Sequence, residues 1–240
     1  MTRIIRFESY RKVQFGRLEK DYIVGEDRIK YIIGEVNILP PVSPSKIICI
    51  GFNYAKHRDD AKKIATKTPT LTLKSPNSII MDGATIELPP DSKHVEHEAE
   101  LGVVVGKAGY NIENPAEHIA GYLPVNDVTA RDIEMEMVQW SASKSFPTFC
   151  PVGGFIETDA DPKNLNIECR VNGKLRQQAN TSEMIYDAFE CVRFASSFMK
   201  LEVGDLICTG TPAGVGKLKN GDVVEVNIFG VGSLKNQVKK

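Results

Sequence analysis

Acidic and apolar residues alternate along the segment from residue 96 to residue 105. Glu96, Glu98 and Glu100 occupy every second position, and the positions from Ala99 to Val105 that alternate with them are apolar. Successive side chains of a β-strand point to opposite faces, so this pattern predicts a strand with one acidic face and one core face. Like charges along one face are unfavourable. We therefore expect either a divalent cation that takes these carboxylates as ligands, or a solvated edge strand.

Composition places the 240-residue chain among ordinary globular proteins, with 42% hydrophobic and 25% charged residues. A net charge of −1 argues against nucleic acid or a membrane surface as the partner. The start of the chain lacks the apolar stretch of a secretory signal, and no apolar run is long enough for a membrane helix. The five cysteines show no C-x-x-C spacing, which is typical of a reduced cytoplasmic protein without a disulfide framework.

Turn signals divide the chain into many short strands and few helices. We expect strands at 7–15, 21–24 and 29–33, which would form a small N-terminal β subdomain over residues 1–44 before the proline-rich break at 39–44. A second domain, 45–240, would contain strands at 46–51, 70–74, 85–88, 96–105, 166–171, 206–209 and 223–228, with a hairpin turn at Asn172-Gly173. Helices are predicted at 54–63, 129–139 and 184–199. This mixture indicates a β-rich α+β fold.

Five polar residues and one glycine-rich turn are candidates for chemistry on local grounds. His57 and Asp60 lie three apart in a predicted helix, where a carboxylate can support an imidazole that acts as a general base. Asp127 could add a third carboxylate to the metal, or could be only a turn residue. Lys144, flanked by small residues, could stabilise an oxyanion or could simply be solvated, and Lys74 has the same two interpretations. The glycine-rich turn around Thr211 could bind a carboxylate.

Taken together, these segments resemble the fumarylacetoacetate hydrolase family, especially its short acylpyruvate hydrolase branch. The matching motifs follow one another in order over residues 46–230: Gly51-Phe52-Asn53-Tyr54 with His57, Lys74-Ser75-Pro76, His97-Glu98-Ala99-Glu100-Leu101, Asn126-Asp127-Val128-Thr129-Ala130-Arg131-Asp132, Lys144-Ser145-Phe146, Asn172-Gly173 through Arg176-Gln177 to Asn180-Thr181, and Thr209-Gly210-Thr211-Pro212-Ala213-Gly214-Val215-Gly216. The resemblance implies a mixed β-sandwich roll, a homodimer and a Mg²⁺ or Mn²⁺ ion.

The resemblance also implies a role for individual residues. Glu98, Glu100 and Asp127 match the metal ligands of the family, whereas Glu96 matches no ligand position. His57 and Asp60 resemble the water-activating pair, although the family commonly has Glu in place of Asp60. Lys144 resembles the lysine beside the reacting carbonyl. Arg176, Gln177 and Thr211 fall in segments that line the substrate pocket in relatives.

The activity implied by this resemblance is hydrolytic cleavage of a C–C bond in a 2,4-dioxo acid, giving pyruvate and a carboxylic acid. Two alternatives use the same stabilised enolate: isomerisation of a 2-hydroxy-dienedioate, and decarboxylation of a 2-oxo diacid such as oxaloacetate, in aromatic or central carbon catabolism. A non-catalytic protein that binds 2-oxo acids is a third alternative, but simple chelation would need neither His57 nor Lys144.

Overall fold

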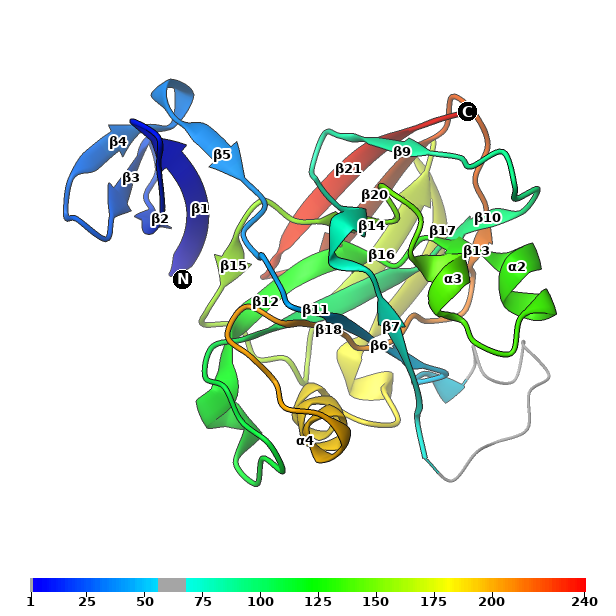
Figure 1. Cartoon of the computed structure of the whole chain (residues 1–240). Helices are drawn as coiled ribbons and strands as arrows, with labels where there is room; N and C mark the ends of the chain where they lie inside the picture. The colour runs from blue at the N-terminus through cyan, green and yellow to red at the C-terminus, as the bar shows by residue number, and fades with distance from the viewer. Residues whose placement is uncertain (1, 56–67) are drawn as a thin grey trace.

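The computed structural model describes residues 2–55 and 68–240. Strands dominate this part of the chain and form three sheets, accompanied by a few short helices (Figure 1). The β-rich α+β fold predicted from the sequence is confirmed. Within the described residues, no helix combines the length and the apolar character needed to cross a membrane.

The largest sheet of the described residues has 13 strands, in the order β4-β3-β2-β1-β15-β12-β11-β18-β6-β7, and β5, β8 and β14 attach to its sides. The bounds of these strands are β1 (Arg3–Ser9), β2 (Lys12–Leu18), β3 (Tyr22–Gly25), β4 (Lys30–Ile32), β5 (Asn37–Leu39), β6 (Ile47–Gly51), β7 (Thr70–Lys74), β8 (Ile79–Met81), β11 (Ala99–Val105), β12 (Ile119–Asn126), β14 (Cys150–Val152), β15 (Ile156–Glu157) and β18 (Leu206–Cys208).

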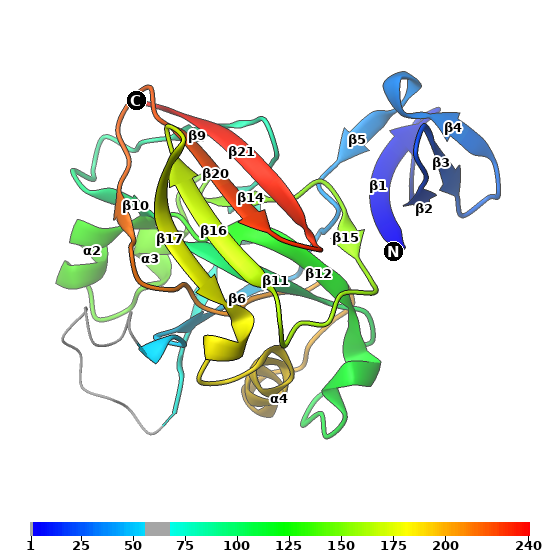
Figure 2. The same cartoon turned by 180° about the vertical axis from the view of Figure 1, so that it is seen from behind.

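The other two sheets have five and three strands in the described chain. The larger runs β17-β16-β20-β21-β9 and lies across one side of the main body (Figure 2); its strands are β9 (Thr85–Glu87), β16 (Asn166–Val171), β17 (Lys174–Asn180), β20 (Val223–Ile228) and β21 (Gly232–Lys239). The smaller is β13-β10-β19, with β10 (Val95–His97), β13 (Thr129–Ala130) and β19 (Gly216–Lys217). The α-helices within residues 2–55 and 68–240 are α2 (Arg131–Glu136), α3 (Ser141–Lys144) and α4 (Ala188–Phe198).

The main hydrophobic core packs β11 against the five-stranded sheet and α4. Leu101 and Val103 of β11 lie in one fully buried cluster with Ile167 of β16, Val226 of β20 and Val192 of α4. Burial of each such side chain stabilises the fold by about 1.5–3 kcal/mol. The predicted core face of the glutamate segment is therefore correct. Because β11 lies between β12 and β18 and is buried along its whole length, the edge-strand alternative is wrong.

The N-terminal strands β1 to β5 form a lobe at one side of the molecule (Figure 1). Their own small core contains Ile5, Phe7 and Ile23. β1 also pairs with β15 through two residue pairs, so main-chain pairing crosses the predicted boundary at residue 44, and the two-domain division stays a prediction. The predicted continuous strand 7–15 is wrong: the chain turns at Tyr10 and Arg11, both with positive φ, and forms the β1–β2 hairpin.

Two predicted helices are shorter in the structure than in the sequence analysis. α2 begins at Arg131, because residues 129–130 pair with β10 as strand β13, and it ends at Glu136 instead of residue 139. α4 begins at Ala188, where Asp187 and Glu190 form a capping box. The turn before it, Thr181–Glu183, is a 3-10 helix. Most of the predicted helix 54–63 lies outside the described residues.

Candidate metal centre

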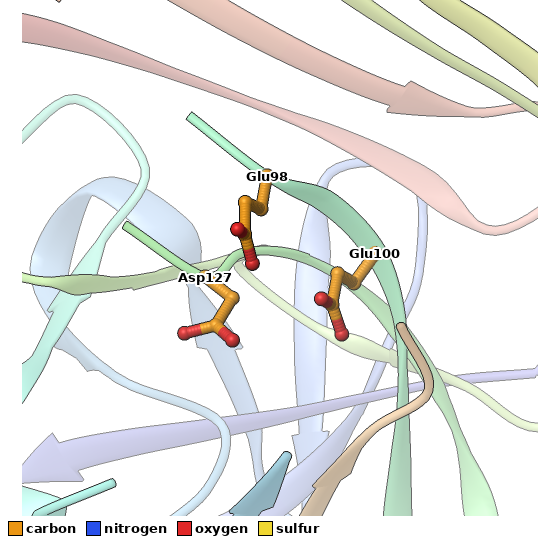
Figure 3. Close-up of side chains that lie close together, drawn as sticks. All are labelled: Glu98, Glu100 and Asp127. Carbon is orange, nitrogen blue, oxygen red and sulfur yellow. The ribbon is translucent and has the colours of Figure 1, made fainter. Parts of the chain in front are cut away.

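Three buried carboxylates converge where β10 gives way to β11 beside the end of β12. Glu98 and Glu100 come from the first chain segment and Asp127 from the second, and one oxygen of each lies within 4.8 Å of the others (Figure 3). The exposed fractions of the three residues are 5%, 2% and 1%. Asn126 holds the two segments together, because its Oδ1 accepts a hydrogen bond of 2.9 Å from the Glu98 amide, while the Asp127 amide donates to Glu98 O at 2.8 Å.

The alternation predicted one continuous strand for the glutamate segment, and the structure shows that this prediction is wrong. The segment breaks at Glu98, and β10 belongs to the three-stranded sheet, where Glu96 pairs with Lys217 and Thr129. The Glu96 carboxylate turns to Arg131 Nε at 2.8 Å and His94 Nε2 at 2.9 Å. Glu96 therefore lies outside the cluster formed by Glu98, Glu100 and Asp127.

Lys144 lies against this cluster with only 4% of its surface exposed. Its Nζ donates to Asp127 Oδ2 at 2.7 Å, Thr129 Oγ1 at 2.8 Å and Glu98 Oε2 at 3.0 Å. Burial lowers the pKa of Lys144, but the negative charges of Asp127 and Glu98 outweigh burial and hold the pKa well above its ordinary value. The side chain is therefore an ammonium group and a hydrogen-bond donor, not a base.

Lys74, at the end of β7, compensates the second oxygen of Asp127. Its Nζ lies 2.5 Å from Asp127 Oδ1 and also donates to the carbonyl oxygens of Val128 at 3.0 Å and Phe149 at 2.5 Å. Burial raises the pKa of Asp127, but the two lysines outweigh it and keep that pKa below its ordinary value. Asp127 is thus ionised between two ammonium groups.

Arg131, the first residue of α2, ties three carboxylates together. Its guanidinium bonds Glu96 through Nε at 2.8 Å, Glu134 through Nη1 at 2.5 Å and Glu98 Oε1 through Nη2. Arg131 and Lys144 therefore hold the two oxygens of Glu98 from opposite sides.

Glu100 differs from the other two members of the cluster, because it forms no ion pair with any described residue. Its Oε2 accepts one hydrogen bond of 2.7 Å, from the Gly210 amide. Burial raises the pKa of Glu100 well above its ordinary value, and the charges of Asp127 and Glu98 raise it further. Burial and the neighbouring charges therefore favour the protonated form of Glu100 in the absence of a cation.

The charges of the described part of the site do not balance. Leaving aside the largely exposed His94, five buried carboxyl groups face three basic side chains, and the members are Glu96, Glu98, Glu100, Asp127 and Glu134 against Lys74, Arg131 and Lys144. If all were ionised, two negative charges would remain, which is the charge of one divalent cation. Carboxylate oxygens are also the ligands that Mg²⁺ and Mn²⁺ prefer. The residues present therefore fit such an ion.

A cavity of about 380 Å³, including its open mouth, lies over the carboxylates. Its polar side holds the cluster, Lys144, Arg131 and Glu134, whereas Phe52 and Trp140 stack edge to face on the apolar side, with ring centroids 5.5 Å apart. Asn53 fixes the turn that carries Phe52, because its Nδ2 donates to Thr209 O at 2.7 Å and Tyr186 O at 2.8 Å. Gly210 has a φ of +97°, and a Cβ there would lie 2.7 Å from that of Asn53, so this turn requires glycine.

The three predicted substrate-binding residues lie in different places. Thr211 lines the cavity, and its hydroxyl donates to Ala99 O at 2.9 Å. Gln177 is buried behind it and donates to Thr211 Oγ1 at 2.7 Å. Arg176 is exposed and lines a separate hollow. His57 and Asp60 lie outside the described residues, so the position of the predicted water-activating pair stays a prediction.

Sequence reasoning left Arg131, Glu134 and Trp140 out of the site, and left Lys74 open between an oxyanion partner and a solvated lysine. Alternation along β7 favours Leu73 inside and Lys74 outside, but Leu73 is 39% exposed and Lys74 only 2%. Arg131 could have been predicted from its position, because it lies only four residues after Asp127, a predicted metal ligand.

Comparison with known proteins is decisive for the family. The fumarylacetoacetate (FAA) hydrolase C-terminal family model matches residues 46–239. The chain belongs to the fumarylacetoacetate hydrolase family. Members of this family include hydrolases, isomerases and tautomerases, so the chain is assigned to a family of enzymes.

Three relatives show the range of activities in the family. A mitochondrial oxaloacetate tautomerase of Xenopus laevis is 40% identical, over 88% of this chain and 72% of the relative. The crystal structure of a 5-carboxymethyl-2-hydroxymuconate delta-isomerase from Mycobacterium smegmatis is 36% identical, with a TM-score of 0.90, and covers 99% of this chain and 98% of its own. A fumarylpyruvate hydrolase from Pseudomonas aeruginosa, in complex with Mn²⁺ and pyruvate, is 29% identical with a TM-score of 0.78, over 82% of this chain and 91% of its own.

Proposed function

We propose that this protein is a divalent-metal-dependent enzyme that interconverts the keto and enol forms of a small 2-oxo acid. The observation that carries the proposal is the buried cluster of Glu98, Glu100 and Asp127 with the ammonium group of Lys144 set against it. Relatives of known activity support it, since the tautomerase and the isomerase above share more of their sequence with this chain than the hydrolase does.

Glu98, Glu100 and Asp127 are the residues that would hold the cation, either Mg²⁺ or Mn²⁺. The ion would supply a Lewis acid for the 2-oxo carboxylate, whose negative charge increases as the enolate forms. The carboxylates fix its position, and the rest of the cavity selects a small substrate.

Lys144 is the group that we expect to stabilise the negative oxygen of the substrate. An ammonium group has three N–H donors, and in this structure Asp127, Thr129 and Glu98 take all three. A substrate oxygen must therefore replace one of these acceptors. The bond to Glu98, at 3.0 Å the longest of the three, is the one that we expect to exchange.

Phe52 and Trp140 would exclude water from the distal end of the substrate. They line the same cavity as the carboxylates and are its aromatic members. A charge that develops in a water-poor site interacts more strongly with Lys144 than it would in bulk water. The substrate that fits is a short 2-oxo acid with a compact distal group.

Oxaloacetate, the compound named for the tautomerase relatives, is the first substrate to test. With Mg²⁺ or Mn²⁺, the protein should accelerate the decay of enol absorbance, and the metal-free protein should not. Glu100→Gln, which keeps the size of the side chain, is the matched control and should be inactive. A rate in the wild type no greater than that of this variant, at saturating metal, would exclude the proposal.

Hydrolysis of a 2,4-dioxo acid is the second candidate function. It is favoured by the predicted pair of His57 and Asp60, and by the likeness to the fumarylpyruvate hydrolase. Acetylpyruvate plus water would give acetate and pyruvate, which can be quantified directly. Release of acetate and pyruvate separates the two functions, because keto–enol exchange breaks no C–C bond. His57→Ala tests the predicted general base and should lower hydrolysis by about 10²–10⁴-fold.

A further inference from the structure

A second, basic hollow shares no lining residue with the metal cavity. Its volume is about 1130 Å³ including its mouth, and its lining includes His97, the residue before Glu98. Arg176, Lys217 and Lys219 surround it. We call these four residues, with Gly216, the basic hollow.

The three cations of the basic hollow are exposed and form no ion pair with any residue that the structure describes. Asp222 is the one acidic side chain among the described residues that line it. That carboxylate is already engaged, because its oxygens accept from Asn172 Nδ2 and from the Lys219 amide, each at 2.8 Å. The hollow therefore has a net positive charge that no described side chain neutralises.

The hydrogen bonds of Gln177 determine which nitrogen of His97 carries the proton. Gln177 Oε1 accepts from the Ala99 amide at 3.1 Å, and Gln177 Nε2 donates to Pro212 O at 2.8 Å, so the orientation of this side-chain amide is fixed. His97 Nδ1 lies 2.9 Å from Gln177 Oε1 and must be the donor of that bond. Nε2 of the neutral imidazole is therefore a hydrogen-bond acceptor.

Gly216 leaves His97 Nε2 accessible from the hollow. A Cβ placed on Gly216 would have this nitrogen as its nearest neighbour, 3.5 Å away, and no other atom within 4 Å. Both residues line the hollow, although His97 itself is only 1% exposed. A ligand atom in front of Gly216 can thus reach a buried acceptor.

We propose that the basic hollow binds a small oxyanion that still carries one O–H group. Arg176, Lys217 and Lys219 would attract its charge, and His97 Nε2 would accept its hydroxyl proton in a hydrogen bond. Hydrogen phosphate and a 2-hydroxy dicarboxylate such as malate share this chemistry. Sulfate and succinate have comparable charge but no O–H group, so they are the matched ligands that the site should discriminate against.

Calorimetry on the full-length, metal-free protein tests this site without involving the metal cavity. Phosphate should bind at one site at least about tenfold more tightly than sulfate, because one buried hydrogen bond is lost with sulfate. Malate against succinate is the parallel experiment. Tighter binding of phosphate than of sulfate would identify a phosphate site. Tighter binding of malate than of succinate would identify a hydroxy acid site. Equal binding within both pairs, or no binding, would overturn the proposal.

Two variants locate the site. Gly216→Ala places a methyl group against His97 Nε2 at ordinary contact distance and should remove the preference for the O–H ligand. Lys217→Gln should weaken binding of the preferred ligand about fivefold or more, whereas Lys174→Gln, an exposed lysine outside the hollow, should not change it. Equal losses in the two lysine variants would indicate diffuse attraction by surface charge and would contradict a built site. Keto–enol assays play no part in these measurements, so their outcome is separate from the proposed function.

Discussion

Two neighbouring residues, His97 and Glu98, face regions of opposite charge and opposite burial. Glu98 belongs to the metal cavity, where nearly every charged side chain is buried and most are paired. His97 belongs to the basic hollow, where the cations are exposed and unpaired within the described chain. His97 is the last residue of β10, and Glu98 lies in the break before β11 begins at Ala99.

The difference follows from the cost of burying charge. A buried ion without a partner costs several kcal/mol, so Asp127 and Glu98 have gathered lysine and arginine partners. Exposed cations are solvated and screened, so Lys217 and Lys219 need none. Substitutions in the cavity should consequently change activity or stability strongly, and substitutions in the hollow should act mainly on ligand binding.

Glu100→Gln should have the largest effect, because Glu100 is the one carboxyl group of the cluster that no described cation compensates. Loss of an outer partner of a metal ligand costs about 10–100-fold in metal affinity, and loss of a ligand should cost more. Affinity for Mn²⁺, measured by calorimetry, should fall at least about 100-fold, and activity should fall with it. Glu96→Gln is the control, since Glu96 faces Arg131 and His94. An equal loss of Mn²⁺ affinity in both variants would mean that the total negative charge of the site, and not Glu100 as a ligand, determines metal binding.

Lys144→Met should reduce turnover by about 10²–10³-fold, as loss of one preorganised donor does in other enzymes. It should not weaken metal binding, because it removes a positive charge that competes for Glu98 and Asp127. The signature is a fall in kcat with Mn²⁺ affinity unchanged or increased. Weakened metal binding would indicate that Lys144 serves mainly to position the ligands.

Lys74→Met tests the other lysine that pairs with Asp127. Lys74, unlike Lys144, does not line the cavity. Removing one partner of a buried ion pair destabilises a fold by about 3–5 kcal/mol. Chemical denaturation of the metal-free protein should show a loss of that size, and bound metal should restore part of it. Stability equal to that of the wild type would show that Lys144 alone suffices for Asp127.

Asp205 offers a smaller effect with a defined pH dependence. This fully buried carboxylate pairs with Lys46 and accepts from the Ser45 hydroxyl at 2.7 Å and the Glu202 amide at 2.8 Å. Burial raises the pKa of Asp205, but these partners outweigh it and lower the pKa below 3.8. Its contribution is therefore present above that pH and disappears as pH falls through the folded-state pKa. Asp205→Asn should cost about 1–3 kcal/mol at neutral pH, and the difference should vanish in strong acid.

Much of the fold could be predicted from sequence because hydrophobic alternation and turn residues are local signals. The core face of β11 and the Asn172-Gly173 hairpin are examples. The Tyr10-Arg11 turn was missed because neither residue favours positive φ, and the conformation is imposed by pairing of β1 with β2. Thr129 was assigned to a helix because its tertiary partner, β10, is not visible in the local sequence.

The carboxylate cluster could be anticipated from the sequence, but its charge compensation could not. Lys74 lies 53 positions before Asp127, and its side chain reaches that carboxylate because β8, which follows β7, pairs with β14, and β14 pairs with β12. Nothing in its own segment distinguishes it from a solvated lysine. Pairing between distant residues depends on packing, so only the folded structure shows that Lys74 compensates Asp127.

Lys217→Gln should have the smallest effect on stability. Lys217 is exposed, on the short strand β19, and forms no ion pair with a described residue, so its removal should change the free energy of unfolding by less than about 0.5 kcal/mol. Denaturation in low and high salt measures this, because a hidden ion pair would be weakened by salt in the wild type alone. Retained stability with weakened phosphate binding is what distinguishes a ligand-binding cation from a structural one. A loss comparable to that of Lys74→Met would mean that the two regions do not differ in the way their burial implies.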